Sequence, residues 1–266
     1  MGRAKLFHMP GYAWHLTHRC HDRRFLLKFS RDKRRWLHWL FQAKKRYKLV
    51  ILGYTVTSNH IHLLVYDNGE KHAVPRSMLL AASRTAREYN IRKMRSGAFW
   101  EDHYHATAIE AETHLQRALV YVDLNMVRAG VVDHPGEWPF GGYAEFMNQR
   151  QRYRLIDRSV LLQLLGVSND ELLKSAYDSW IRERLSRGSL GREAMWTESI
   201  AVGEDKFIKG LKKRLGIRAN TREIAQAEGE GSYILREGES PYEGIFRGEN
   251  EGLSNKDKFR KTLNDL

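Results

Sequence analysis

The eight residues at positions 58–65, Ser-Asn-His-Ile-His-Leu-Leu-Val, constrain this chain more than any other stretch, because they are typical of a β-strand that carries two histidines. Side chains alternate between the two faces of a strand, so His60 and His62 point to one side and Ile61 to the other. Two imidazoles roughly 7 Å apart along a strand can bind one metal ion. An isolated pair of this kind is more often two half-exposed histidines without a ligand, so a metal site needs support from elsewhere in the chain.

Further strands and helices surround this stretch in an order that indicates the fold class. Alternating or apolar patterns predict strands at 11–19, 49–57, 60–65 and 105–109, the second of them central in its sheet. Apolar stripes predict helices at 31–47, 75–95 and 113–129. The last helix has capping-box spacing at Thr113 and Gln116, and Gly130 is expected to end it. This order predicts an α+β protein with a ferredoxin-like (split βαβ) antiparallel sheet and helices packed on it.

The C-terminal half differs from this unit in composition. A charged run at 149–154 predicts a linker, which divides the chain into a domain at 1–147 and a region at 148–266. Helical patterns at 160–165, 170–185 and 204–215 predict that this second region is mainly helical. Residues 227–252 are rich in glutamate and glycine with few apolar side chains, so we expect an acidic tail that is extended or disordered.

The charge of the chain indicates its partner. The formal net charge is +13, and residues 1–50 hold 14 lysines or arginines against two acids. Clustered basic side chains bind polyanions by releasing counterions from phosphates, so we expect nucleic acid rather than a membrane. No apolar run approaches the length of a membrane span, the N-terminus lacks a signal-peptide pattern, and the single cysteine, Cys20, excludes an intrachain disulfide. These features predict a cytoplasmic protein.

The predicted helix at 113–129 carries a narrow polar window between apolar faces. Its members are His114, Arg117, Tyr121, Asn125 and Arg128. A helix this apolar is buried, so its polar side chains must face a ligand, a cleft or a satisfied hydrogen-bond network. Tyr121 and Asn125 are four residues apart and therefore neighbours on one face. A buried tyrosine with structural partners is the plainer interpretation, and the histidine pair favours a functional one.

Combined with the strand, the window predicts an active site. His60, His62 and Asn125 are candidate ligands for Mg²⁺ or Mn²⁺, and Zn²⁺ also suits this donor set. A metal with open coordination positions orients a phosphodiester, and Tyr121 is the candidate nucleophile on the same helix face. Tyr104, which His103 and His105 flank, is the competing nucleophile.

Four blocks of sequence together resemble the REP-associated tyrosine transposases, which belong to the single-tyrosine HUH endonucleases. They lie at 54–65, 99–105, 121–132 and 138–143, and the resemblance covers roughly residues 8–147. It implies a ferredoxin-like fold and metal-dependent cleavage and rejoining of single-stranded DNA at palindromic repeats folded as hairpins. It places the 5′-phosphotyrosine on Tyr121 and the metal on His60, His62 and Asn125. Met126 stands where the family usually has proline, and without proline the helix is expected to run on unkinked.

The predicted DNA contacts and the rival functions follow from these assignments. The candidate DNA-binding residues are Arg128, Arg117, His114, Arg84, Arg87, Arg23 and Arg24. The partner is single-stranded or hairpin DNA, bound by a monomer or homodimer in the bacterial cytoplasm, at the nucleoid. One rival is a non-catalytic DNA- or RNA-binding regulator derived from a transposase. The other is a two-histidine phosphoesterase that uses His15-Leu-Thr17 and His105-Ala-Thr107 without metal.

Overall fold

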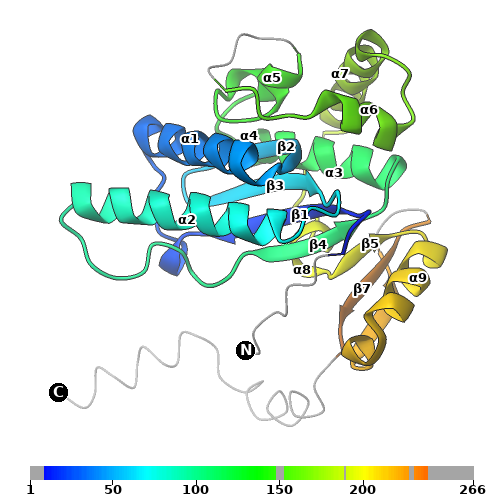
Figure 1. The fold of residues 1–266 in the computed structure, drawn as a ribbon. Helices are drawn as coiled ribbons and strands as arrows, with labels where there is room; N and C mark the ends of the chain where they lie inside the picture. The colour runs from blue at the N-terminus through cyan, green and yellow to red at the C-terminus, as the bar shows by residue number, and fades with distance from the viewer. Residues whose placement is uncertain (1–8, 148–152, 189, 228–230, 239–266) are drawn as a thin grey trace, which may run out of the picture.

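A seven-stranded sheet runs through the computed structural model, with helices on both of its faces (Figure 1). The structure describes residues 9–147, 153–188, 190–227 and 231–238. The strands are β1 (Ala13–Arg19), β2 (Val50–Val56), β3 (His60–Tyr66), β4 (His105–Ile109), β5 (Ala201–Gly203), β6 (Arg222–Gln226) and β7 (Tyr233–Glu237). The α-helices are α1 (Ser30–Tyr47), α2 (Ala73–Arg92), α3 (Thr113–Asp123), α4 (Asn125–Arg128), α5 (Tyr143–Phe146), α6 (Arg158–Leu165), α7 (Asp170–Ser186), α8 (Met195–Glu198) and α9 (Asp205–Leu215). Short 3-10 helices lie at His21–Arg23, Pro135–Glu137 and Gly216–Ala219.

The first four strands form the predicted ferredoxin-like sheet. Their order is β2-β3-β1-β4, and each neighbouring pair is antiparallel. A bulge in β2 shifts its register with β3 between Ile51 and Gly53. A Cβ atom at Gly53 would lie 2.9 Å from Leu119 Cδ2, so glycine at this position lets α3 lie close to the sheet.

The prediction that β2 is a central strand is wrong. β2 is at the end of the strand order, yet all seven of its residues are buried. The chain after α4 covers it: Gly142 donates to the Tyr54 carbonyl (2.7 Å), and the Trp138 indole donates to the Val56 carbonyl (3.1 Å). A loop that covers an edge strand hydrogen-bonds its free backbone groups and shields it from water. Such a strand can therefore have as apolar a sequence as a central strand.

The C-terminal region extends this sheet. β5 pairs in parallel with β4, β7 pairs with β5, and β6 pairs with β7. The predicted helices are present as α6, α7 and α9, and the three strands are an addition that the sequence pattern did not predict. β5 has only three residues, which is below the length at which alternation can be recognised. Of the stretch 227–252, residues 228–230 and 239–252 lie outside the described part, and Tyr233–Glu237 forms β7 instead of a disordered tail.

The two faces of the sheet have different coverings. α1 and α2 pack together on one face, and α3 lies on the other (Figure 1). On β1, His18 stacks on Trp100, whose indole donates to the Ala82 carbonyl of α2. His15 lies three residues before His18, so its side chain is on the opposite face of β1, where it contacts Tyr121 of α3. Alternation along β1 and β3 therefore places His15, His60 and His62 on the α3 side.

The predicted helix at 113–129 is broken. α3 ends at Asp123, Leu124 has φ −78° and ψ 4°, and α4 begins at Asn125. The Tyr121 carbonyl accepts a hydrogen bond from Arg128 Nη2 (3.1 Å). The helix is therefore not continuous even without the proline, and the Arg128 side chain contacts the backbone at the break. The capping box is also absent: Glu112 occupies the N-cap, without a side-chain hydrogen bond to the helix.

Within the described residues, no helix is both long enough and apolar enough to cross a membrane.

Candidate active site

Three histidines from two strands meet on the α3 side of the sheet. His15 of β1 and His62 of β3 stack with ring centroids 5.0 Å apart. His60 lies edge-on to His62, with centroids 4.9 Å apart. The predicted pair is confirmed on one face, and His15 is a third member of the cluster.

Hydrogen bonds determine which nitrogen of each ring carries the proton. The Trp196 carbonyl oxygen can only accept, so His15 donates to it from Nδ1 across 2.8 Å. Burial lowers the pKa of His15 to about 4, so the ring is neutral and its Nε2 must accept. His62 Nδ1, 2.9 Å away, is therefore the donor to that atom. Neutral His62 then presents an unprotonated Nε2.

His60 is held in the matching tautomer from the other side. The Asn59 side-chain nitrogen donates to the Arg23 carbonyl (3.1 Å), which turns its oxygen toward His60. His60 Nδ1 donates to this oxygen across 2.7 Å. Burial lowers the pKa of His60 to about 4, so its Nε2 also carries a lone pair.

The donor atoms fit a divalent cation. The Nε2 atoms of His60 and His62 face each other 3.1 Å apart, and Asn125 Nδ2 lies 2.9 Å from His62 Nε2, to which it donates. To bind a cation, the Asn125 amide would turn over so that its oxygen takes the place of this nitrogen. Two facing lone pairs repel each other unless a positive charge lies between them. Ligand atoms at ~2.1 Å from an octahedral ion stand ~3 Å apart, which matches this spacing. The described residues contain no group of three or more His, Cys, Asp or Glu that could hold a metal, so the set depends on the Asn125 amide.

Tyr121 lies beside this cluster. Its ring centroid is 6.0 Å from that of His62 and 6.2 Å from that of His15, edge-on to both. The Arg128 guanidinium lies 4.1 Å from the Tyr121 ring centroid. Burial raises the pKa of the Tyr121 hydroxyl, and the positive charges of Arg128 and Arg192 act in the opposite direction. The helix break brings Arg128 onto Tyr121, so the arginine can stabilise negative charge there.

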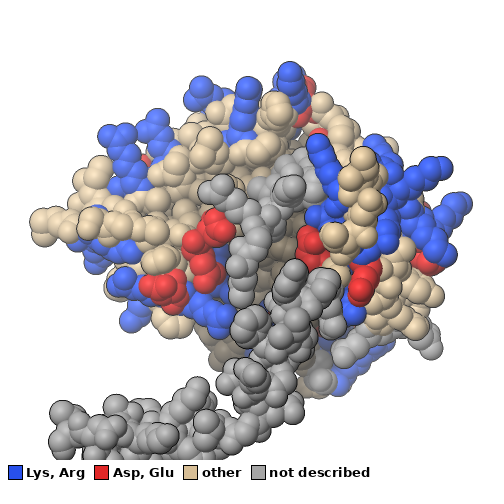
Figure 2. All heavy atoms as spheres, turned by 90° about the horizontal axis from the view of Figure 1, so that it is seen from below, with Lys and Arg blue, Asp and Glu red and all other residues tan. Residues whose placement is uncertain are grey.

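The other predicted DNA-binding residues are spread over the molecule. Arg117 donates to Ser232 Oγ (2.7 Å), and buried His114 contacts the same oxygen (3.2 Å), so both join α3 to the C-terminal region. Arg84 and Arg87 are exposed on α2, across the sheet from the histidines. On the face drawn in Figure 2, lysines and arginines gather around the rim and acids lie nearer the middle.

Arg23 and Arg24 lie near the histidines. Both are exposed in the loop after β1, and the Arg23 carbonyl holds Asn59, the partner of His60. Their exposed side chains are therefore at the His60 end of the cluster, in contrast to those of α2.

The structure disfavours two competing assignments, Tyr104 as the nucleophile and the two-histidine phosphoesterase. Tyr104 is buried against His18, with ring centroids 6.3 Å apart, on the α1 and α2 side of the sheet, and burial raises its pKa well above the usual value. His15 and Thr107, one residue from each phosphoesterase motif, are fully buried at 0% exposure. Both side chains donate to backbone carbonyls, His15 to that of Trp196 and Thr107 to that of Ser199.

His18 gives a pH dependence of stability that is independent of the site. It is buried, donates to the Asp102 carbonyl (2.8 Å), and burial lowers its pKa to about 4. As the pH falls from ~6.5 to ~4, the His18 side chain binds a proton in the unfolded chain but not in the folded one. The free energy of unfolding therefore decreases over this pH range. Within this range, one such histidine lowers the free energy of unfolding by about 1.4 kcal/mol for each pH unit.

We expect His18→Gln to flatten this acid loss, because glutamine can donate to the same carbonyl but does not titrate. Urea unfolding at pH 7 and pH 4.5 should show a difference smaller by about 2 kcal/mol in the variant than in the wild type. Equal pH slopes in the two proteins would show that His18 titrates normally in the folded state.

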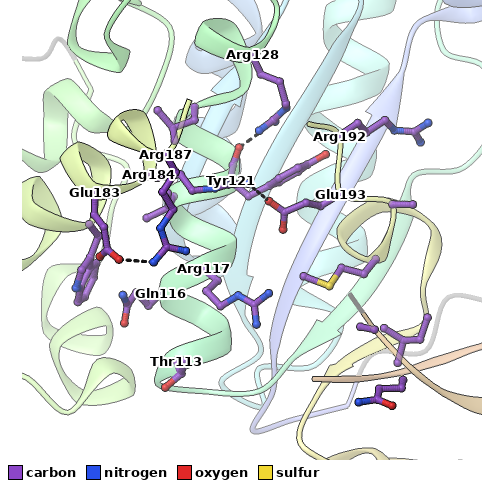
Figure 3. A pocket seen from close by; sticks show the side chains of 18 residues that line it. Thr113, Gln116, Arg117, Tyr121, Arg128, Glu183, Arg184, Arg187, Arg192 and Glu193 are labelled. Carbon is purple, nitrogen blue, oxygen red and sulfur yellow. Dashed lines mark hydrogen bonds and ion pairs between the residues drawn. The ribbon is translucent and has the colours of Figure 1, made fainter. Parts of the chain in front are cut away.

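Some residues of the site were missed by sequence reasoning. His15 was noted only as half of a rival motif, and the Trp196 carbonyl carries no side-chain signal. Arg184, Arg187 and Arg192, at the end of α7 and in the loop after it, line a pocket that Tyr121 also lines, and no motif in the sequence indicates it (Figure 3).

Comparisons with known proteins agree with the geometry. The family described as "Transposase IS200 like" matches residues 9–125, from just before β1 to Asn125. A solved structure described as a REP-associated tyrosine transposase bound to a REP hairpin resembles the chain with a TM-score of 0.46 and 17% identity, over 56% of this chain and 87% of that one. No curated protein matches by sequence. The matched stretch contains His60, His62, Tyr121 and Asn125, so over residues 9–125 the chain is similar to the IS200-like transposases.

Proposed function

We propose that this protein is a metal-dependent endonuclease and transposase for single-stranded DNA, and that it joins the cut strand to Tyr121. One observation carries the proposal: two unprotonated imidazole nitrogens and an amide converge beside the ring of a tyrosine. Ligands without a nucleophile would favour a structural metal, and a buried tyrosine without ligands would favour a packing role. Their combination is what phosphodiester transfer requires.

His60, His62 and Asn125 would hold Mg²⁺ or Mn²⁺. Such an ion, when bound, polarises the scissile phosphate and neutralises charge that develops on it. His15 and the Trp196 carbonyl keep His62 in the ligand tautomer, as outer partners of metal-binding histidines do. The C-terminal region thus supports the ligands of the transposase domain.

Tyr121 would attack the phosphorus atom. Its oxygen forms the new P–O bond, the bond from phosphorus to the 3′ oxygen breaks, and that oxygen leaves with a proton as a 3′-hydroxyl. The phenol proton must be lost first, and burial opposes this loss while the Arg128 guanidinium favours it. The resulting 5′-phosphotyrosine keeps the energy of the phosphodiester. Attack by a 3′-hydroxyl reverses the step and rejoins the strand without a nucleotide cofactor.

Hairpin or palindromic repeat DNA is the substrate that we propose. Residues 9–125 are similar to the IS200-like transposases, and the solved structure that resembles this chain was obtained with a REP hairpin. Unpaired bases at a hairpin end expose a phosphodiester to a buried tyrosine, which a continuous duplex does not.

A denaturing gel tests the proposal. We expect labelled single-stranded hairpin DNA and Mn²⁺ to give a covalent protein–DNA band that chelator removes. Tight binding with no adduct on any single-stranded DNA would instead favour the non-catalytic regulator.

The proton arrangement of His15 can be tested without DNA. His15→Leu removes the acceptor for His62 Nδ1, so Mn²⁺ affinity should fall by roughly 10–100-fold. His18→Leu is the matched control, because it replaces another buried histidine of β1 on the opposite face. An equal loss in both variants would show that β1 is merely destabilised.

A further inference from the structure

A cavity of about 750 Å³ opens between α3 and the C-terminal region. Five arginines line it, and we call it the arginine cleft: Arg117, Arg128, Arg184, Arg187 and Arg192. Glu183 and Glu193 also line it, which leaves a formal excess of three positive charges. Figure 3 shows these side chains arranged around Tyr121, with Arg117 and Tyr121 on the helix that forms one wall.

Three of the five arginines belong to the C-terminal region at 148–266, and ion pairs hold them in place. Arg184 pairs with Glu193 (2.9 Å), Arg187 with Glu183 (2.5 Å) and Arg192 with Glu198 (2.5 Å). Arg187 and Arg192 keep 65% and 59% of their side-chain surface exposed. They are therefore positioned by their partners and remain open to an anion.

The size and chemistry of the cleft favour a single strand. A cavity of about 750 Å³ is too small to take up a double helix. Guanidinium groups bind phosphates, and the cleft also has an aromatic and apolar wall, which includes Trp180, Val120 and Ile234. Positive charge beside an aromatic surface is the arrangement that binds single-stranded nucleic acid, with phosphates on the arginines and bases on the rings.

Tyr121 lines the same cavity, so a strand bound along the cleft lies beside this side chain. We propose that the arginine cleft binds the single-stranded DNA segment next to the scissile phosphate, and that Arg187 and Arg192 are phosphate contacts supplied by the C-terminal region. This assignment rests on the proposed function, since it takes Tyr121 as the point of strand joining.

Salt-dependent binding of labelled oligothymidine tests the cleft apart from the chemistry. The full chain with Tyr121→Phe is used in chelator, so that neither cleavage nor metal contributes. Each single-strand phosphate contact contributes about 0.7 to the slope of log affinity against log salt. We therefore expect Arg187→Gln with Arg192→Gln to lower the slope by about 1.4 and to weaken binding, whereas duplex DNA of equal length should be unaffected.

Arg182→Gln is the matched control. Arg182 lies on α7, whose C-cap is Arg187. It is 73% exposed and is paired with Asp178 four residues away, as Arg187 is with Glu183, but it does not line the cleft. An unchanged slope in the double variant, or the same loss in Arg182→Gln, would overturn the assignment. The proposed function is judged separately: an adduct with wild-type protein supports it even if the slope is unchanged, and a lowered slope without any adduct supports the cleft alone.

Discussion

Tyr121→Phe is expected to abolish the covalent protein–DNA product and to reduce strand cleavage by roughly 10³-fold or more, because it removes the attacking oxygen. The ring would keep its packing against Arg128, His62 and Trp196, since phenylalanine has the same aromatic body. We therefore expect little change in stability and in metal binding. Gel analysis of adduct and cleaved strand, with thermal unfolding and Mn²⁺ titration of the same sample, measures all of these effects.

Tyr104→Phe is the control for this loss. Tyr104 is buried on the opposite side of the sheet, so its hydroxyl should not affect the product. An adduct that persists in Tyr121→Phe and disappears in Tyr104→Phe would show that Tyr104 is the nucleophile, on the opposite face of the sheet, and would contradict our assignment.

His62→Ala is expected to have the second large effect. It removes the central donor, which contacts His15, His60 and the Asn125 amide at once. We expect Mn²⁺ affinity to fall by more than ~100-fold, since loss of an outer partner alone costs 10–100-fold. Cleavage should fall to the level seen with chelator. Calorimetric titration with Mn²⁺ and the gel assay give the two readouts.

His105→Gln is the matched variant for His62→Ala. His105 is on β4, which β1 separates from the strand of His62, and it donates to the Ser199 carbonyl (2.9 Å), away from the converging nitrogens. Glutamine can donate the same bond, so metal affinity should be unchanged. A similar loss of Mn²⁺ in both variants would mean that the ion binds elsewhere or that the fold is weakened in general.

Much of the candidate site could be predicted from the chain alone. Alternation placed His60 and His62 on one face of a strand, and helical spacing placed Tyr121 and Asn125 on one side of a helix. The strand pattern is local and holds in the structure. Tyr121 and Asn125 both lie beside His62, although a break at Leu124 separates them. The ferredoxin-like order of the first four strands followed from the sequence of elements, and the structure has it.

The rest depends on contacts between distant residues. The break at Leu124 places Arg128 over Tyr121, and no helix signal predicts it, because proline is absent from this stretch. The His15 partner is a backbone carbonyl 181 residues away, which has no side-chain signature. The arginine cleft needs α7 and β7 to come together beside α3, and β7 lies in a stretch whose composition is typical of disorder.

Identifying the residue that carries the DNA tests the central claim most directly. Wild-type protein is incubated with single-stranded hairpin DNA and Mn²⁺, digested with protease and nuclease, and its peptides are sequenced by tandem mass spectrometry. Our account predicts a nucleotide linked through its 5′-phosphate to Tyr121, in amounts that chelator abolishes. A nucleotide on another residue, or strand cleavage without any nucleotide attached to the protein, would contradict it.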